Sequence, residues 1–301
     1  LREDMQYYRE VGRGAILQWL DLDPAQARRL ADELAENAKP ENARYRYDYY
    51  TDNCSTRVRD ALDRTLHGAL KRQLSGRSGG DTYRSESVRL ASPATWMWIG
   101  FDIGLGPFGD RPLSRWEQAF LPRRLADDLR ETRLADGRPL VVAEQELLPQ
   151  AQAAEPAERQ RSLLPWLLLG IAVAVAVLAL APRMPRGVAG FAFAYWLACG
   201  LLGLVLALGW AFTEHRALWA NRNLLLFDPL CLLLLPGAWG VLRGRAPSAR
   251  FRGLLVAVAT IAAFAVVPLW LQTLPQRNGH WIALLLPIHA ASAWAGAKRK
   301  A

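Results

Sequence analysis

The chain has 301 residues and a formal net charge of +9; 51% of its residues are hydrophobic and 22% are charged. Residues 1–162 carry 25 basic and 26 acidic side chains, whereas residues 163–301 carry 12 basic and 2 acidic ones. This segregation excludes a single soluble domain and a disordered chain, because the second half is far too apolar for either. It also argues against nucleic-acid binding, since the only solvated half has no positive excess.

The soluble half contains an early helix signal followed by a strand signal. Asp23 is a good N-cap and Pro24 suits the first helical position, so we expect a helix that ends at residues 37–40. Tyr45, Tyr47 and Tyr49 then alternate with polar residues. This period of two predicts a strand that buries one aromatic face.

A cysteine follows directly after the predicted strand. Asp52 or Asn53 can cap a helix that runs to about Leu66, which places Cys54 in its first turn. The helix dipole and the unpaired backbone N–H groups there favour the thiolate, and the N–H groups can form an oxyanion hole. Cys54 is the only cysteine of the soluble half and so has no disulfide partner there. The pattern predicts a nucleophile; a buried structural thiol is the alternative.

A cysteine nucleophile needs a base. His67 is the only histidine of the soluble half, but thirteen residues along one helix separate it from Cys54 by roughly 20 Å. We therefore expect the base from sequence before Leu1 or from the membrane half, where His215 and His280 fall in loops. No cluster has metal-ligand spacing, and no cofactor is expected.

The remaining soluble sequence predicts turns and a boundary. Gly104, Gly106 and Gly109 are interpreted as tight turns beneath an aromatic cluster, and residues 133–142 as a small hairpin around Asp136-Gly137. A Gln/Ala/Glu/Pro-rich linker follows. The predicted organisation is a soluble domain over residues 1–149, a linker over 150–162 and a membrane domain over 163–301.

The membrane half contains five apolar runs, each near the roughly 20 residues that cross a bilayer. They are residues 163–181, 188–212, 224–242, 254–274 and 281–297. One set of loops and the C-terminal tail holds nine Arg and Lys, and the other loops hold three. The positive-inside rule places the first set in the cytoplasm and the soluble half outside. Because export needs a signal that the sequence does not show, we expect roughly one further domain upstream, on the order of 100 residues, with a signal and a base histidine.

Polar residues gather in the loop between the second and third runs. They are Glu214, His215, Asn221, Asn223 and Asp228. They predict either a lipid-headgroup or catalytic constellation, or a hydrogen-bonded loop that caps two helices; Asp228 is expected about one turn inside the third span. His289, in the middle of the fifth run, predicts a hydrogen bond between helices.

An ordered set of motifs resembles the Lnb family of bacterial envelope proteins. The motifs are Tyr-x-Tyr-x-Tyr-Tyr-x-x-Asn-Cys-Ser-Thr-Arg, Gly-Leu-Gly-Pro-x-Gly-Asp, Phe-Leu-Pro and His-x-x-x-Trp-x-Asn-x-Asn-Leu-Leu. The resemblance implies an α+β, permuted papain-like periplasmic domain, N-terminally incomplete here, followed by an all-α bundle of five transmembrane helices. It also implies Cys54 as nucleophile. Asn53, Thr56 and Arg57 would shape the site, and His215, Asn221 and Asn223 carry over as motif positions, His215 as a further catalytic candidate.

The function that this resemblance implies is N-acylation of lipoproteins at the bacterial inner membrane, with a periplasmic N-terminal domain and a cytoplasmic C-terminus. Cys54 would take an acyl chain from a phospholipid or from the lipoprotein's own diacylglyceryl group, and the lipoprotein's N-terminal amine would receive it. Two alternatives stay open. One is a membrane-anchored cysteine hydrolase that acts on peptidoglycan peptides or lipid esters, and the other is a non-catalytic envelope scaffold.

Overall fold

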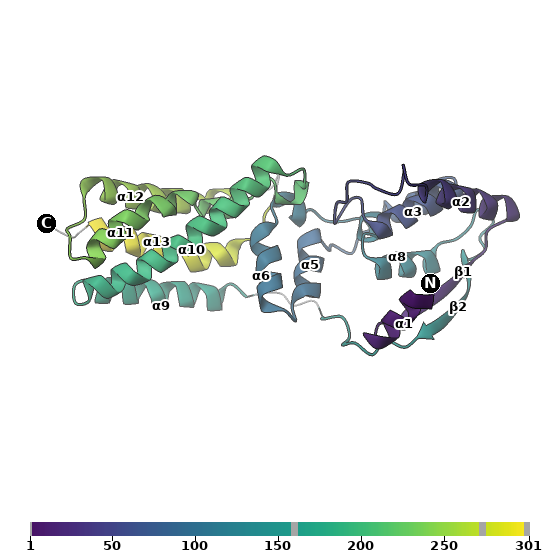
Figure 1. Cartoon of the computed structure of the whole chain (residues 1–301), viewed down its shortest axis with the longest axis horizontal. Coiled ribbons are helices and arrows are strands. Elements are labelled where there is room, and N and C mark those ends of the chain that lie inside the picture. Colours follow the sequence, from purple (N-terminus) through teal and green to yellow (C-terminus); the bar gives the residue numbers. More distant parts are fainter. Residues whose placement is uncertain (1, 158–161, 271–274, 298–301) are drawn as a thin grey trace. The chain divides into compact units, whose positions relative to one another are not determined.

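A computed structural model describes residues 2–157, 162–270 and 275–297. The chain forms two compact units (Figure 1). Unit 1 comprises residues 1–83 and 112–156, and unit 2 comprises residues 84–111 and 157–301. Residues 84–111 therefore pack with the helical second half, although the sequence analysis places them inside the soluble domain of residues 1–149. The physical reason is a set of hydrogen bonds to the loops of the bundle, described below.

Unit 1 is an α/β region. Its elements are α1 (Arg2–Glu10), β1 (Ala15–Leu20), α2 (Pro24–Asn37), α3 (Cys54–Thr65), α4 (Ala69–Leu74), α7 (Arg115–Gln118), α8 (Pro122–Glu131) and β2 (Val141–Leu148). β1 and β2 pair antiparallel, with Ala15 opposite Leu148 and Leu20 opposite Val141. Helix α8 packs against β2 and against α3, so α3 is held in a small helical core. The core is made largely of leucines from α3, α4 and α8.

Two local predictions for unit 1 are confirmed. Asp23 caps α2 through a capping box with Gln26, and Pro24 is the first helical residue. Residues 133–140 fold back in a tight turn, with a bridge between Arg133 and Pro139. Gly137 supplies the positive φ, +86°, that this turn requires.

The predicted strand at residues 45–49 is wrong. The Asp48 side chain accepts hydrogen bonds from the N–H groups of Tyr50 and Thr51, at 2.9 and 2.8 Å, which makes a turn in place of an extended run. Among the described residues this segment has only an isolated bridge, between Asp48 and Asp52. Tyr47 and Tyr49 are exposed. Tyr50 is the buried ring instead, packed against Tyr83 and Phe120.

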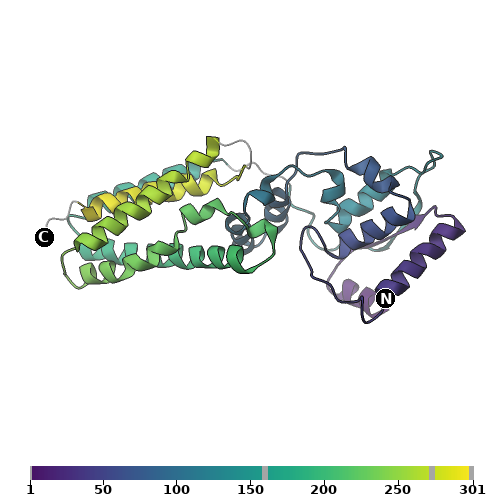
Figure 2. The ribbon, with the colours of Figure 1, turned by 90° about the horizontal axis from the view of Figure 1, so that it is seen from above.

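Unit 2 is helical. Its elements are α5 (Tyr83–Ala91), α6 (Thr95–Gly104), η1 (Pro107–Asp110), α9 (Leu164–Leu180), α10 (Pro185–Phe212), η2 (Arg216–Leu218), η3 (Arg222–Leu225), η4 (Pro229–Leu234), α11 (Leu235–Leu242), α12 (Ala249–Phe264), η5 (Val267–Trp270) and α13 (Gly279–Ala297). Helices α9 to α13 lie side by side along most of their lengths (Figures 1 and 2). Helix α13 packs against α9 and α12, and α10 packs against α11.

Among the described residues, two helices of unit 2 are long and apolar enough to cross a membrane, α10 and the run from Ala249 to Trp270, and a bent pair of helices makes a third if it counts as one span. Helix α9 is apolar but shorter, and residues 271–274 of the predicted fourth span lie outside the described residues. The predicted third span is not one straight helix: Arg216–Leu225 and Pro229–Leu242 meet at 42°. The break has a local cause, because Asp228 caps η4 by accepting from Leu230 N at 2.9 Å, and Pro229 begins the new helix.

Candidate functional site

Cys54 is the first residue of α3 and is exposed. Asn53 caps the helix: its Oδ1 accepts from Thr56 N at 2.9 Å, and Thr56 Oγ1 accepts from Asn53 N at 2.8 Å. In the described parts of the chain, the N–H groups of Cys54 and Ser55 have no hydrogen-bond partner. The sulfur therefore lies at a helix end that presents positive dipoles and open donors, as the sequence predicts.

The start of α3 is fixed to a second sequence motif, the Phe-Leu-Pro of residues 120–122. The Asn53 side chain donates to Phe120 O at 2.9 Å and to Tyr49 O at 2.8 Å. Ser55 Oγ donates to Ala119 O at 2.7 Å. Asn53 and Ser55 are both buried, so these contacts orient the exposed cysteine between them. Two motifs 64 to 67 residues apart in the sequence thus form one site.

Arg57 borders this site. It forms two hydrogen bonds with Asp52, at 2.7 and 2.9 Å, and its guanidinium lies 3.5 Å from the centre of the Tyr45 ring. The hydrogen bond to Asp52 raises the pKa of Arg57, so this residue keeps its positive charge beside the cysteine helix. Arg57 is half-exposed and leaves the approach to Cys54 polar.

His67 is not a partner of Cys54. It follows Leu66, the C-cap of α3, with a positive φ of 53°, so the whole helix separates it from the thiol. At 1.5 Å per residue the separation is about 20 Å. Within the described part of unit 1, the Cys54 thiol makes no hydrogen bond or ion pair.

A second cluster of polar residues occupies unit 2. The Asn221 side chain donates to Ile103 O and Gly104 O, both at 2.8 Å, and Asn223 donates to Ile103 O at 2.9 Å. These bonds join the end of α6 to the loop that follows α10. They explain why residues 84–111 belong to the helical unit. The sequence motifs at 104–110 and 215–225 thus meet in space.

Gly106 makes this junction possible. Its N–H donates to Ala217 O at 2.7 Å, and a Cβ at this position would lie 2.2 Å from Trp219 O. Real Cβ atoms do not approach this closely, so the position admits only glycine without a shift of the backbone. Gly106 therefore serves the close approach of two backbones, whereas Gly104 ends helix α6 and its Cβ position is open.

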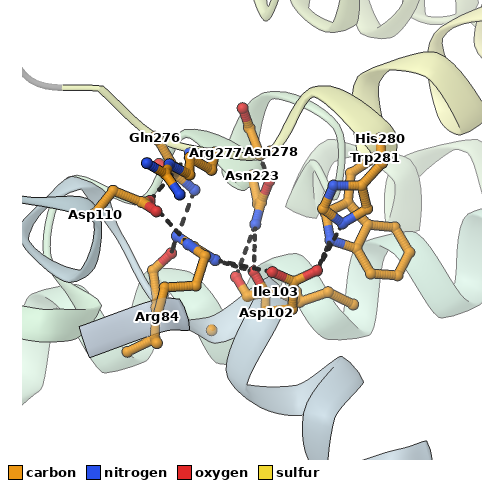
Figure 3. A network of polar contacts seen from close by, with 12 residues as sticks. Arg84, Asp102, Ile103, Asp110, Asn223, Gln276, Arg277, Asn278, His280 and Trp281 are labelled. Carbon is orange, nitrogen blue, oxygen red and sulfur yellow. Dashed lines mark hydrogen bonds and ion pairs between the residues drawn. The ribbon is translucent and has the colours of Figure 1, made fainter. Parts of the chain in front are cut away.

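The cluster includes a carboxylate–imidazole pair. His280 Nε2 lies 2.6 Å from Asp102 Oδ2, and Trp281 Nε1 donates to the same oxygen at 3.1 Å (Figure 3). All three side chains are buried. A carboxylate that holds one imidazole nitrogen can fix the tautomer and orientation of the ring. The pair is therefore suited chemically to proton transfer, but its burial equally fits a structural role.

Arg84 closes the cluster on its other side. Its Nε donates to Asp110 Oδ2 at 2.8 Å, and further nitrogens donate to the carbonyl oxygens of Asp102 and Leu105 (Figure 3). Arg277 N also donates to Asp110, at 3.1 Å. Burial raises the pKa of the Asp110 carboxyl, and the nearby Arg84 opposes this effect.

Amide side chains complete the network. Gln276 donates to Asn221 Oδ1 and Asn278 donates to Asn223 Oδ1, each at 2.9 Å. The segment before α13 thereby joins α6 and the loop after α10. The predicted loop that caps helices is confirmed, since Asn221 also accepts from Asn223 N and caps η3.

The other predicted polar residues take separate places. His215 is exposed at the start of η2 in unit 2. Asp228 is a helix cap at the break of the third span and not one turn inside a continuous helix. His289 Nε2 lies 3.0 Å from Leu226 O, which confirms the predicted bond between helical segments. Cys199 and Cys231 are buried in the bundle.

Sequence reasoning missed the network partners Arg84, Asp102, Gln276 and Asn278. Only Asp102, within Trp-Ile-Gly-Phe-Asp-Ile-Gly, is a polar residue in otherwise apolar or aromatic surroundings, and this is the signal that could have identified it. Arg84, Gln276 and Asn278 lie in polar stretches that carry no such signal. In the parts of the chain that the structure covers, no group of three or more His, Cys, Asp or Glu residues could hold a metal ion.

Comparison with known families matches both units. The family model described as the Lnb N-terminal periplasmic domain matches residues 2–91, and the one described as the Lnb transmembrane domain matches residues 161–300. No curated protein and no solved structure matches the chain. The two matched regions follow each other along the chain in the same order as the sequence motifs that lie in unit 1 and in unit 2. The chain belongs to the Lnb family, with an N-terminal periplasmic domain and a C-terminal transmembrane domain.

Proposed function

We propose that the chain is a membrane-bound thiol acyltransferase that moves an acyl chain through a Cys54 thioester to the N-terminal amine of lipoproteins. One observation carries the proposal: in an Lnb-family chain, the single cysteine of unit 1 is exposed at a capped helix start with two open N–H donors. Structural thiols are typically buried and inert, whereas nucleophilic thiols are accessible to their substrates.

The reaction would take two steps at one sulfur. The Cys54 thiolate attacks the carbonyl carbon of an acyl ester; the C–S bond forms, the C–O bond breaks and the alcohol leaves with a proton. The N-terminal amine then attacks the thioester; the C–N bond forms, the C–S bond breaks and the thiol is regenerated. In each step the N–H groups of Cys54 and Ser55 would stabilise the negative oxygen.

The surrounding residues would serve as positioning groups. Asn53 and Thr56 hold the helix start through the capping box, and Arg57 keeps a positive charge beside it. In unit 2, Asn221 and Asn223 would fix the loop that carries His215. His215 is the proposed second catalytic residue, an exposed imidazole for proton transfer. The likeness to papain-like enzymes is supported by one feature, the cysteine at the start of α3.

The proposed topology accounts for the fusion of the two units. Five spans would hold the chain in the bacterial inner membrane, with a periplasmic N-terminal domain and a cytoplasmic C-terminus, as the distribution of Arg and Lys predicts. Both proposed substrates, a phospholipid or diacylglyceryl donor and a lipoprotein acceptor, are anchored in the same membrane. A soluble enzyme would meet neither at high local concentration.

The experiment is mass spectrometry of a lipoprotein N-terminal peptide from cells that express the full chain. Wild type and a Cys199→Ala control should yield a peptide with an N-linked acyl chain, and Cys54→Ala should yield a free amine. A peptide that keeps its acyl chain in Cys54→Ala refutes the role of Cys54. Release of free fatty acid without an amide product would instead identify a hydrolase, and no change in any lipid product would identify a scaffold.

A further inference from the structure

The end of the bundle opposite the polar network contains an apolar groove. It lies among helices α9 to α13 and is a shallow, open depression with a cavity volume of about 50 Å³, lined almost entirely by apolar side chains. Helix α13 begins beside the network at His280 and reaches the groove at Ser292 and Ala295. Small side chains such as Ala192 and Ala295 leave the space open.

A polar rim adjoins the groove. It lies between the α9–α10 turn and the α11–α12 loop and shares Pro185, Val241 and Pro247 with the groove. Arg186 and Arg245 line it, and both are exposed. Gly244, with a φ of +80°, lets the α11–α12 loop turn so that the Arg186 guanidinium lies against it; a Cβ there would be 3.1 Å from Arg186 Nη2.

The rim carries positive charge without compensation. In the described part of the chain, neither Arg186 nor Arg245 forms an ion pair. The sequence from residue 163 onward contains only two acids, Glu214 and Asp228, and both lie toward the other end of the bundle. The first turn of α10 adds to this field, because its N-cap, Met184, supplies no side-chain hydrogen bond.

One polar atom inside the groove also lacks a partner. Among the described residues, Ser292 Oγ is buried without a hydrogen bond, and the residue as a whole is 7% exposed. Ser292 precedes the last residue of α13 by five positions, or about 7.5 Å along the helix. A buried hydroxyl without a partner is costly, so a ligand acceptor at this depth would relieve it.

We propose that the rim and groove bind an anionic glycerophospholipid such as phosphatidylglycerol. Its phosphate would lie on Arg186 and Arg245, an ester carbonyl would accept from Ser292 Oγ, and one acyl chain would lie along the shallow apolar groove. Basic pockets between transmembrane helices suit anionic headgroups, and guanidinium groups match phosphate geometry. The site is separate from Cys54, so its test does not depend on acyl transfer.

The experiment measures lipid retention by the full chain in nanodiscs of phosphatidylcholine with a minor fraction of phosphatidylglycerol, by native mass spectrometry. Two arginines near a membrane surface predict a roughly thirtyfold preference for phosphatidylglycerol. The Arg186→Gln/Arg245→Gln double variant should lose this preference. Arg183→Gln is the matched control, because Arg183 lies in the same turn but donates to Ala179 O and does not line the rim.

Four outcomes would overturn the proposal, three of them with the variants already named. These three are equal retention of both lipids by wild type, a preference that survives in the double variant, and stabilisation by inorganic phosphate in lipid-free detergent equal to that by phosphatidylglycerol. Ala295→Phe tests the groove itself, since the ring would occupy the acyl-chain space. A folded Ala295→Phe protein that still prefers phosphatidylglycerol would show that no chain enters the groove, and would refute it.

Discussion

Replacing Gly106 by Ala should destabilise unit 2 selectively. The added Cβ would lie 2.2 Å from Trp219 O, so the two backbones must separate by about 1 Å. Overpacking of this kind costs about 1–3 kcal/mol. The shift would also strain the Gly106–Ala217 hydrogen bond, worth about 1 kcal/mol. We expect a total loss of about 2–4 kcal/mol, which lowers the Tm of this unit by roughly 5–15 °C.

Gly104→Ala is the matched control for this measurement. It lies two residues away in the same motif, at the end of α6, and its Cβ would meet nothing within 4 Å. Thermal unfolding of both full-length variants in the same detergent should show a loss for Gly106→Ala and almost none for Gly104→Ala. Equal Tm values for the two variants would refute the close approach of residue 106 to the loop after α10.

Three further predictions concern other sites. Asp102→Asn should lower the stability of unit 2 by about 3–5 kcal/mol in thermal unfolding, because it leaves the buried guanidinium of Arg84 without one of its two carboxylate partners; an unchanged Tm would contradict this. Burial raises the pKa of Asp128 to about 6. The contribution of the protonated carboxyl to the free energy of unfolding should therefore be fully present below pH 4 and decline as the pH rises through 6. Asp128→Asn should abolish this decline of the free energy of unfolding between pH 4 and 6. A maleimide should modify Cys54 and leave Cys199 intact in the folded chain, and equal modification would contradict their assigned exposure.

The cysteine site could be predicted from the sequence because its causes are local. Asn53 and Thr56 are three residues apart, and their capping box fixes where α3 begins and so where Cys54 lies. The same logic could have located the break in the third span. Asp228-Pro229 repeats the cap-and-proline pattern of Asp23-Pro24, but the apolar run around it suggested a continuous helix.

The polar network could not be predicted because its partners are far apart in the chain. Arg84, Asp102, Asn221 and His280 are brought together only by the packing of α6 against loops more than 100 residues away. Periodicity carries no information on such pairing. The prediction of a strand at residues 45–49 was wrong for a local reason. The two hydrogen bonds that the Asp48 side chain accepts make a turn there, in spite of the alternating tyrosines.

The most direct test of thioester chemistry is the intact mass of the purified full-length chain after incubation with a diacylated lipopeptide whose N-terminal amine is blocked. Without an acceptor amine, the acyl group should remain on Cys54, add one acyl mass to the protein and leave on treatment with hydroxylamine. Peptide mapping should place the adduct on Cys54, and Cys54→Ala should acquire none. A wild-type protein that stays unmodified, or one acylated equally in Cys54→Ala, would contradict the proposed thioester.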